Sequence, residues 1–134
     1  MSQPIVAAVQ MTSLADVAKT MVGRDCGSVP VVSGDGRTLA GIITDRDMVV
    51  RGIAEGRNPL TLSARDAMTS PAISIGEDAS LDDCTDLMEA NKVRRVPVVD
   101  ASGAIVGIVA QADVARCASR KEAGELVRDV STPR

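Results

Sequence analysis

Apolar residues along this chain fall into short runs that predict the same order of strands and helices twice. Two runs of four or five apolar residues flank a polar turn containing glycine, which is typical of a β-hairpin. In the first half this hairpin spans residues 29–43, and in the second half it spans residues 96–109. Because the runs are apolar throughout and do not alternate, we expect helices to cover both faces of each sheet.

Helix signals precede each hairpin. Ser13-x-x-Asp16 and Ser80-x-x-Asp83 have the spacing of a capping box, in which a serine and an acidic side chain satisfy each other's backbone N–H groups. The apolar residues that follow each serine recur at helical spacing. A second helix should follow each hairpin, and a short extended segment should precede each first helix. These predicted second helices are residues 45–54 and 111–118, and the extended segments are residues 5–8 and 72–75.

The two halves of the chain repeat one sequence unit, and an internal repeat of this kind determines the architecture of a fold. Ser13-Leu14-Ala15-Asp16 matches Ser80-Leu81-Asp82-Asp83, and Val29-Pro30-Val31-Val32 matches Val96-Pro97-Val98-Val99 at the same shift. We therefore expect an α/β (α+β) protein made of two repeats, each with the order strand, helix, strand, strand, helix. The predicted boundaries are 1–58 for the first repeat, 59–119 for the second, and 120–134 for a tail that packs back on the pair.

The composition excludes several classes of function. The chain has no histidine, which removes the commonest general base and the commonest metal ligand. It also has no Phe, Tyr or Trp and a net charge of −3, whereas proteins that stack nucleic-acid bases use aromatic side chains and are usually basic. Its three cysteines are far apart and contain no C-x-x-C pair. We therefore expect no catalysis, no metal site, no nucleic-acid partner and reduced cysteines.

Targeting signals are also missing from the sequence. No apolar run reaches the roughly 18 residues that a membrane span needs. The first residues, Met1-Ser2-Gln3-Pro4, lack the basic and apolar segments of a signal peptide. We expect a cytoplasmic protein without a membrane partner.

Three sequence features together resemble tandem cystathionine-β-synthase-type (CBS) domains, above all those of stand-alone bacterial CBS-pair proteins. They are Asp66-Ala67-Met68-Thr69, the Val-Pro-Val-Val of both halves, and Gly41-Ile42-Ile43-Thr44-Asp45-Arg46-Asp47. The resemblance covers nearly the whole chain. It implies two repeats packed with pseudo-twofold symmetry, ligand clefts between them, and a homodimer. It further implies an adenosine ligand: AMP, ADP or ATP, with S-adenosylmethionine as another member of the class.

The resemblance assigns ribose binding to the pattern Gly-h-h-Thr/Ser-x-x-Asp, in which h is apolar. Gly41, Ile43, Thr44 and Asp47 fit this pattern, and a carboxylate suits both hydroxyls of a ribose as an acceptor. In the second half Asp113 is present, but Ala110 replaces the hydroxyl residue, which puts that site in doubt. Thr44-x-x-Asp47 is also a capping box that needs no ligand, and the two roles are compatible.

Phosphate would need positive charge, which the first motif lacks because Asp45 and Asp47 dominate it. Arg94 and Arg95 are the candidate donors, since guanidinium groups match phosphate oxygens, and Arg46 is a further candidate. All three could equally be solvated surface charges. The candidates for adenine contact are Ile5, Ala7, Val29, Pro30 and Ile43, for which a place in the core is the alternative.

Two hypotheses about function follow. The first is a non-catalytic regulatory module that binds an adenosine nucleotide, senses energy status and signals through its dimer or through an unknown protein partner. The second is a ligand-free structural or dimerisation module in which the nucleotide motifs survive only as helix caps.

Overall fold

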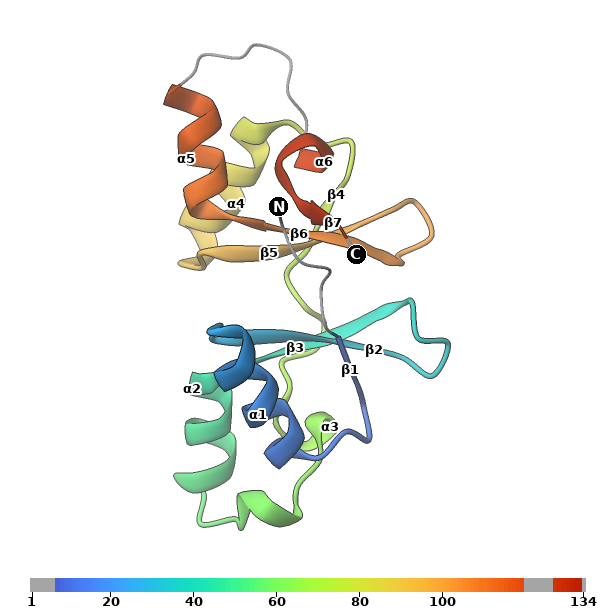
Figure 1. The fold of residues 1–134 in the computed structure, drawn as a ribbon, viewed down its shortest axis with the longest axis vertical. Coiled ribbons are helices and arrows are strands. Elements are labelled where there is room, and N and C mark those ends of the chain that lie inside the picture. Colours follow the sequence, from blue (N-terminus) through green and yellow to red (C-terminus); the bar gives the residue numbers. More distant parts are fainter. Residues whose placement is uncertain (1–6, 120–126, 134) are drawn as a thin grey trace. The chain divides into compact units, whose positions relative to one another are not determined.

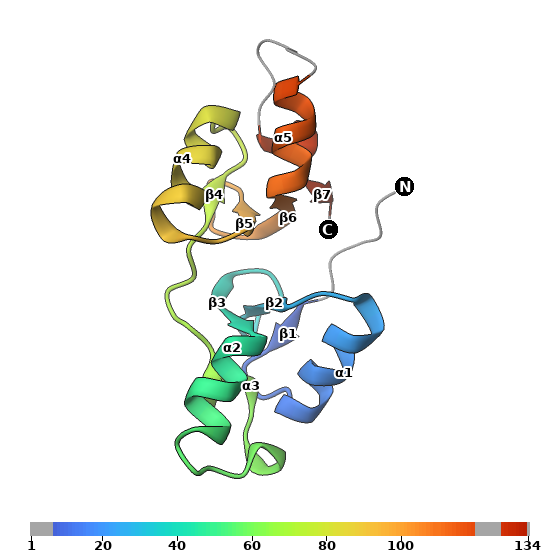
Figure 2. The same cartoon turned by 90° about the vertical axis from the view of Figure 1, so that its left-hand side faces the viewer.

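The structure, a computed structural model, describes residues 7–119 and 127–133 (Figures 1 and 2). The chain divides into two compact units between Ala72 and Ile73, here called the N-terminal unit and the C-terminal unit. Each unit combines a β-sheet with helices in the predicted order of strand, helix, strand, strand, helix. The α/β (α+β) fold class and the repeat are therefore confirmed.

The N-terminal unit contains a three-stranded sheet of order β1-β2-β3. Strand β1 is parallel to β2, and β2 is antiparallel to β3. Its elements in chain order are β1 (Ala8–Val9), α1 (Leu14–Arg24), β2 (Ser28–Val32), β3 (Leu39–Thr44), α2 (Asp45–Met48), the π-helical turn η1 (Val49–Ile53), the 3-10 turn η2 (Pro59–Thr61) and α3 (Ala64–Ala67).

The C-terminal unit repeats this plan in a sheet of order β4-β5-β6-β7. Its pairings are parallel for β4 with β5 and antiparallel for β5 with β6 and β6 with β7. Its elements are β4 (Ile75–Gly76), α4 (Leu81–Asn91), β5 (Arg95–Val99), β6 (Ile105–Ala110), α5 (Gln111–Ser119), α6 (Val127–Val130) and β7 (Thr132–Pro133).

The two hairpins match residue for residue. Pro30 lies opposite Ile42 in one and Pro97 lies opposite Ile108 in the other. The first strand of each hairpin also has a register shift at the same place, between Val31 and Val32 in one and between Val98 and Val99 in the other. The turns reach a backbone φ of +73° at Gly36 and +87° in the second half, values that favour glycine because it has no Cβ.

The helices of each unit lie on one side of its sheet in both views (Figures 1 and 2). The prediction that helices cover both faces is therefore wrong for a unit taken by itself. Strand β6 shows the reason, because buried and half-buried residues alternate along it and only every second side chain points towards the helices. The buried cores comprise Ala8, Leu14, Val17, Met21, Val29, Val31, Ile43, Leu62, Ala64 and Ala67 in the N-terminal unit, and Ile75, Cys84, Met88, Val96, Val98, Val109, Val114 and Val127 in the C-terminal unit.

The two predicted helix starts are correct, but their capping boxes form only halfway. Ser13 Oγ accepts from Asp16 N at 3.1 Å, and Ser80 Oγ accepts from Asp83 N at 3.1 Å. In neither of these described helices does the acidic side chain accept the reciprocal bond from the serine backbone N–H. Ser13 also lies in an antiparallel bridge with Ser63, at which Leu14 N donates to Leu62 O at 3.0 Å and Ala64 N donates to Thr12 O at 2.7 Å.

The segment after the first repeat packs with the N-terminal unit, although the sequence repeat assigns it to the second half. Leu62, Ala64 and Ala67 are buried in the N-terminal core. Further on, Ile42 N donates to Thr69 O at 3.0 Å and Thr69 N donates to Ile42 O at 2.8 Å. Residues 59–72 thus belong to one repeat by sequence and to the other unit in space.

Part of the expected tail lies in the C-terminal unit. Residues 120–126 and 134 fall outside the described residues. Val127 is fully buried, and β7 pairs with β6 by placing Thr132 opposite Ile108. The bridge between Ile42 and Thr69 has the same place on β3. Each hairpin therefore has its outer strand covered by a segment that follows its second helix.

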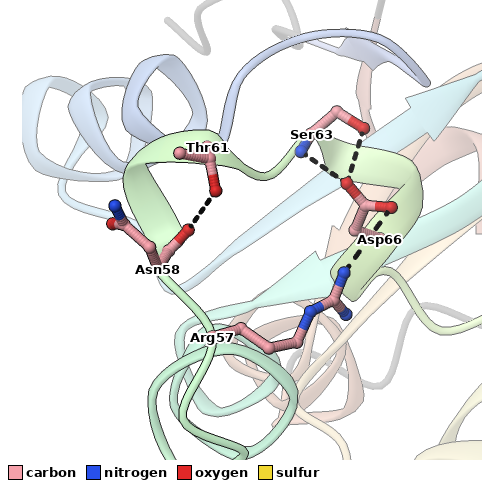
Figure 3. Close-up of polar contacts among 5 residues, drawn as sticks. All are labelled: Arg57, Asn58, Thr61, Ser63 and Asp66. Atoms are coloured by element: carbon pink, nitrogen blue, oxygen red, sulfur yellow. Dashed lines mark hydrogen bonds and ion pairs between the residues drawn. The ribbon is translucent and has the colours of Figure 1, made fainter.

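A polar cluster opens helix α3 (Figure 3). Asp66 Oδ2 accepts from Ser63 N at 2.8 Å and from Ser63 Oγ at 3.1 Å, and Arg57 lies 4.0 Å from Oδ1. Thr61 Oγ1 donates to the backbone oxygen of Asn58 at 2.9 Å in the turn just before it. The Ser63 backbone N–H, helped by its hydroxyl, lowers the pKa of Asp66 below its ordinary value of 3.8.

Replacement of this carboxylate should make stability less dependent on pH. A lowered pKa in the folded state stabilises the protein above the ordinary value of 3.8, and this contribution is lost as the pH falls through the folded value. Asp66→Asn is therefore expected to lower the urea midpoint at neutral pH, with the difference from the native protein shrinking under acid. Circular dichroism measures both midpoints. Asp86→Asn, at an exposed acid in the middle of α4, is the control, and a difference unaffected by pH would contradict this role.

Candidate functional site

The Gly41–Asp47 motif runs from β3 into α2, and its two polar side chains cap the helix. Thr44 is the N-cap residue, with extended backbone angles. Its Oγ1 accepts from Asp47 N at 3.0 Å, while Asp47 Oδ2 accepts from Thr44 N at 3.0 Å. The box is complete in both directions, unlike those that begin α1 and α4. The capping role predicted for these residues is confirmed.

The Asp47 carboxylate keeps a second oxygen outside this box. Its Oδ1 accepts from Thr69 Oγ1 at 3.2 Å, longer than the 2.5–2.7 Å typical of a strong O–H···O⁻ bond. Asp47 is half-buried, and it forms no ion pair within the described part of the chain. The motif therefore presents a carboxylate that is oriented by the cap and is not paired with any cation of residues 7–119 or 127–133.

The corresponding carboxylate of the second half has different surroundings. Arg116 Nη2 donates to Asp113 Oδ1 at 2.7 Å, which makes an ion pair within helix α5. Ala110 occupies the position of Thr44 and has no hydroxyl to offer. The second motif thus lacks the threonine half of the cap, and its carboxylate is paired with a guanidinium group.

The arginines predicted for phosphate contact are all exposed. Arg95 begins β5 opposite Ala110, and Arg94 O accepts from Gln111 N at 2.7 Å. Within the C-terminal unit, both arginines therefore lie beside the second motif. Arg46 is exposed on α2.

The apolar candidates for adenine contact are mostly core residues. Val29 and Ile43 face each other across the hairpin with exposures of 1% and 0%, and Pro30 is also fully buried. Since these exposures include the backbone, the three residues have the core position that the sequence left open as the alternative. Ala7 is half-buried just before β1, and Ile5 lies outside the described residues.

Sequence reasoning missed the residues that hold Thr69 beside Asp47. Arg51 Nη1 donates to Met68 O at 2.5 Å, and Ser70 Oγ donates to Ala40 O at 2.8 Å. Arg51 lies four residues after Asp47, so both side chains reach the same segment. The Asp-Ala-Met-Thr mark was visible in the sequence, but nothing local indicated which strand it would pair with.

Gly41 has a packing role at this place. A Cβ on Gly41 would lie 2.7 Å from Thr69 O and 2.9 Å from Met68 Sδ, distances too short for non-bonded atoms. The absence of a side chain lets residues 68–69 lie flat against β3. The glycine of the motif therefore serves the pairing between Ile42 and Thr69.

No cluster of three or more His, Cys, Asp or Glu side chains suited to a metal ion occurs among the described residues. Cys26 is half-buried and Cys84 is buried, and both are free thiols. Burial raises the pKa of the Cys84 thiol. None of the described helices is both long and apolar enough to span a bilayer.

The CBS domain family matches the sequence twice, over residues 1–52 and 64–120. These matches span most of the chain, and the two units have the element order of CBS-pair structures. The chain belongs to the CBS domain family and is a small protein with two such domains in tandem.

Two relatives match over most of their length. YlbB, an uncharacterized protein of Bacillus subtilis, is 38% identical over 122 residues, which cover 90% of this chain and 81% of YlbB. Hypoxic response protein 1 of Mycobacterium tuberculosis is 34% identical over 121 residues, which cover 90% of this chain and 83% of the relative.

Two similar solved structures hold different ligands. The structure of Hypoxic Response Protein I with two coordinated zinc ions has a TM-score of 0.75 at 34% identity. The match covers 84% of this chain and 89% of the chain in that structure. CBSX2 of Arabidopsis thaliana in complex with AMP has a TM-score of 0.75 at 27% identity and covers 87% of this chain and 88% of its own. Ligand type therefore differs among proteins similar to this one.

A side chain at position 41 should disrupt the pairing of β3 with residues 68–69. Gly41→Ala is expected to lower the free energy of unfolding by about 1–3 kcal/mol, the usual cost of overpacking a tight contact. Gly34→Ala is the matched control, because a Cβ there meets nothing within 4 Å. Urea unfolding followed by circular dichroism compares the two variants. Equal midpoints would show that the strand pairing tolerates a methyl group.

Proposed function

We propose that this protein is a non-catalytic regulatory module that binds an adenosine nucleotide of the AMP, ADP or ATP class. The proposed contact is between the ribose hydroxyls and the Asp47 carboxylate, with Thr44 beside it. S-adenosylmethionine shares the same adenosine and belongs to the ligands to be tested. The ligand signals energy status through a homodimer or a partner protein in the cytoplasm.

The Asp47 carboxylate is the observation that carries this proposal. Its cap fixes its orientation, it is only partly buried, and it forms no ion pair with a described cation. Such a group suits the two hydroxyls of a ribose, since a carboxylate accepts several hydrogen bonds. CBSX2, which was solved with AMP, supports this choice of ligand.

The proposed site is singular, although the domain is repeated. Asp113 is already bound to Arg116, and Ala110 cannot supply the hydroxyl that Thr44 supplies. Both differences favour the first motif. Arg94 and Arg95 are the cations proposed for an anionic group, because each is exposed and neither forms an ion pair with a described residue.

A ligand-free structural module is the second candidate function. It is favoured by the completeness of the cap, because Thr44 and Asp47 satisfy each other without any ligand. On this hypothesis the motif persists because helix caps of this kind stabilise a protein by about 1 kcal/mol.

Bound nucleotide should be visible in the freshly purified protein. The chain has no Trp, Tyr or Phe, so it absorbs very little in the near ultraviolet, where adenine absorbs strongly. We expect an adenine-like absorption band, and mass spectrometry of the small molecules released by denaturation would identify the compound. If the spectrum is blank, and titration with AMP, ADP, ATP and S-adenosylmethionine in a calorimeter also gives no heat, the structural module is favoured.

Paired substitutions should locate the ribose contact. Asp47→Asn is expected to weaken AMP binding at least about tenfold, because it removes the charge that strengthens hydrogen bonds to the hydroxyls. Asp113→Asn should leave the affinity unchanged, since that carboxylate is paired with Arg116. Isothermal titration calorimetry measures both affinities, and circular dichroism checks that each variant is folded. Equal losses in both variants, or no loss at Asp47, would contradict the assignment.

A further inference from the structure

Thr69 and the proposed ligand need the same oxygen of Asp47. Oδ2 holds the helix cap through Thr44 N, so Oδ1 is the oxygen left for other donors. In the structure the Thr69 hydroxyl takes a position on Oδ1 at 3.2 Å. A ribose hydroxyl that approaches Oδ1 from the side of Thr69 competes with this hydroxyl for the same lone pair. The length of the bond indicates that it is weaker than the capping bonds, and so more easily replaced.

The Thr69 hydroxyl is one of several contacts that hold the segment of residues 68–70, here called the strap. The backbone of Ile42 exchanges two hydrogen bonds with Thr69, at 3.0 and 2.8 Å. Arg51 Nη1 donates a hydrogen bond to Met68 O at 2.5 Å, and Ser70 Oγ donates one to Ala40 O at 2.8 Å. Hydrogen bonds thus fix the strap at residues 68 and 70, on both sides of the bond between Thr69 and Asp47 that a ligand would replace.

The strap leads directly into the connection between the two units. The units divide between Ala72 and Ile73, two residues after Ser70. The strap and the connection are therefore continuous in the chain. Anything that loosens the strap changes how firmly the start of this connection is held.

We infer that Asp47 is shared between ligand and strap, so that a bound hydroxyl replaces the Thr69 hydroxyl and loosens residues 68–70. This inference rests on the proposed function, because it concerns the same carboxylate. It adds the route by which occupancy of the site reaches the link between the units. It also assigns Thr69 a role that opposes ligand binding.

Two substitutions at Thr69 separate this role from packing. Thr69→Val keeps the branched shape and removes the hydroxyl, whereas Thr69→Ser keeps the hydroxyl. We expect AMP to bind Thr69→Val roughly three- to tenfold more tightly than the native protein, which is the range that one displaced hydrogen bond accounts for. Thr69→Ser should bind AMP as the native protein does. Calorimetry gives all three affinities.

Hydrogen exchange tests the strap itself in the full chain. The Thr69 amide should exchange faster when AMP is added to the native protein, and in Thr69→Val it should exchange faster even without AMP. The amide of Leu14, which donates to Leu62 O at 3.0 Å, is the reference that should not change.

The outcomes distinguish the two proposals. If the native protein binds none of the adenosine compounds, the proposed function fails and this inference fails with it. If the native protein binds AMP but Thr69→Val binds it equally or more weakly, only the sharing of Asp47 is overturned. The sharing is likewise overturned if AMP binds and leaves the exchange of the Thr69 amide unchanged.

Discussion

The exposed backbone of a hairpin's outer strand has to be satisfied, and much of the N-terminal unit is arranged around this requirement. Ile42 lies opposite Pro30, and its own N–H and C=O point away from β2. Thr69 O accepts from this N–H, and Thr69 N donates to this C=O. Because the strap must lie close to β3 to do so, position 41 has no room for a side chain.

Because the strap pairs with β3, it also supplies hydrogen-bond partners for two polar side chains that follow this strand, Asp47 and Arg51. Asp47 caps α2 with one carboxylate oxygen and bonds to Thr69 with the other. Arg51, one turn later, bonds to Met68 O. The motif that looks like an isolated helix start in the sequence is therefore part of a layer formed by strand, helix and strap. The C-terminal unit covers its own outer strand with β7, which joins at the matching residue, Ile108.

What could be predicted from the sequence is what short-range patterns determine. The hairpins, the helix starts at Ser13 and Ser80 and the cap at Thr44 depend on residues close together in the chain, and each was predicted at the right place. The bridge between Ser13 and Ser63 was not, because the two residues lie fifty positions apart in the chain. The bond between Asp47 and Thr69 was missed for the same reason. Spacing along the chain carries no information about which strand a distant segment will join.

The difference between the two carboxylates shows how a repeated domain can lose its symmetry of function while keeping its symmetry of fold. Hairpin register, bulge and covered edge are the same in both units, since these depend on backbone bonds and on Pro, Gly and Val at fixed positions. The side chains around Asp47 and Asp113 are free to differ, because neither carboxylate belongs to the core. Arg116 stands three residues after Asp113, whereas Val50 occupies the corresponding position after Asp47. Two side chains, Thr44 in the first motif and Arg116 in the second, thus give the two carboxylates different surroundings, although the hairpin backbone is the same in both units.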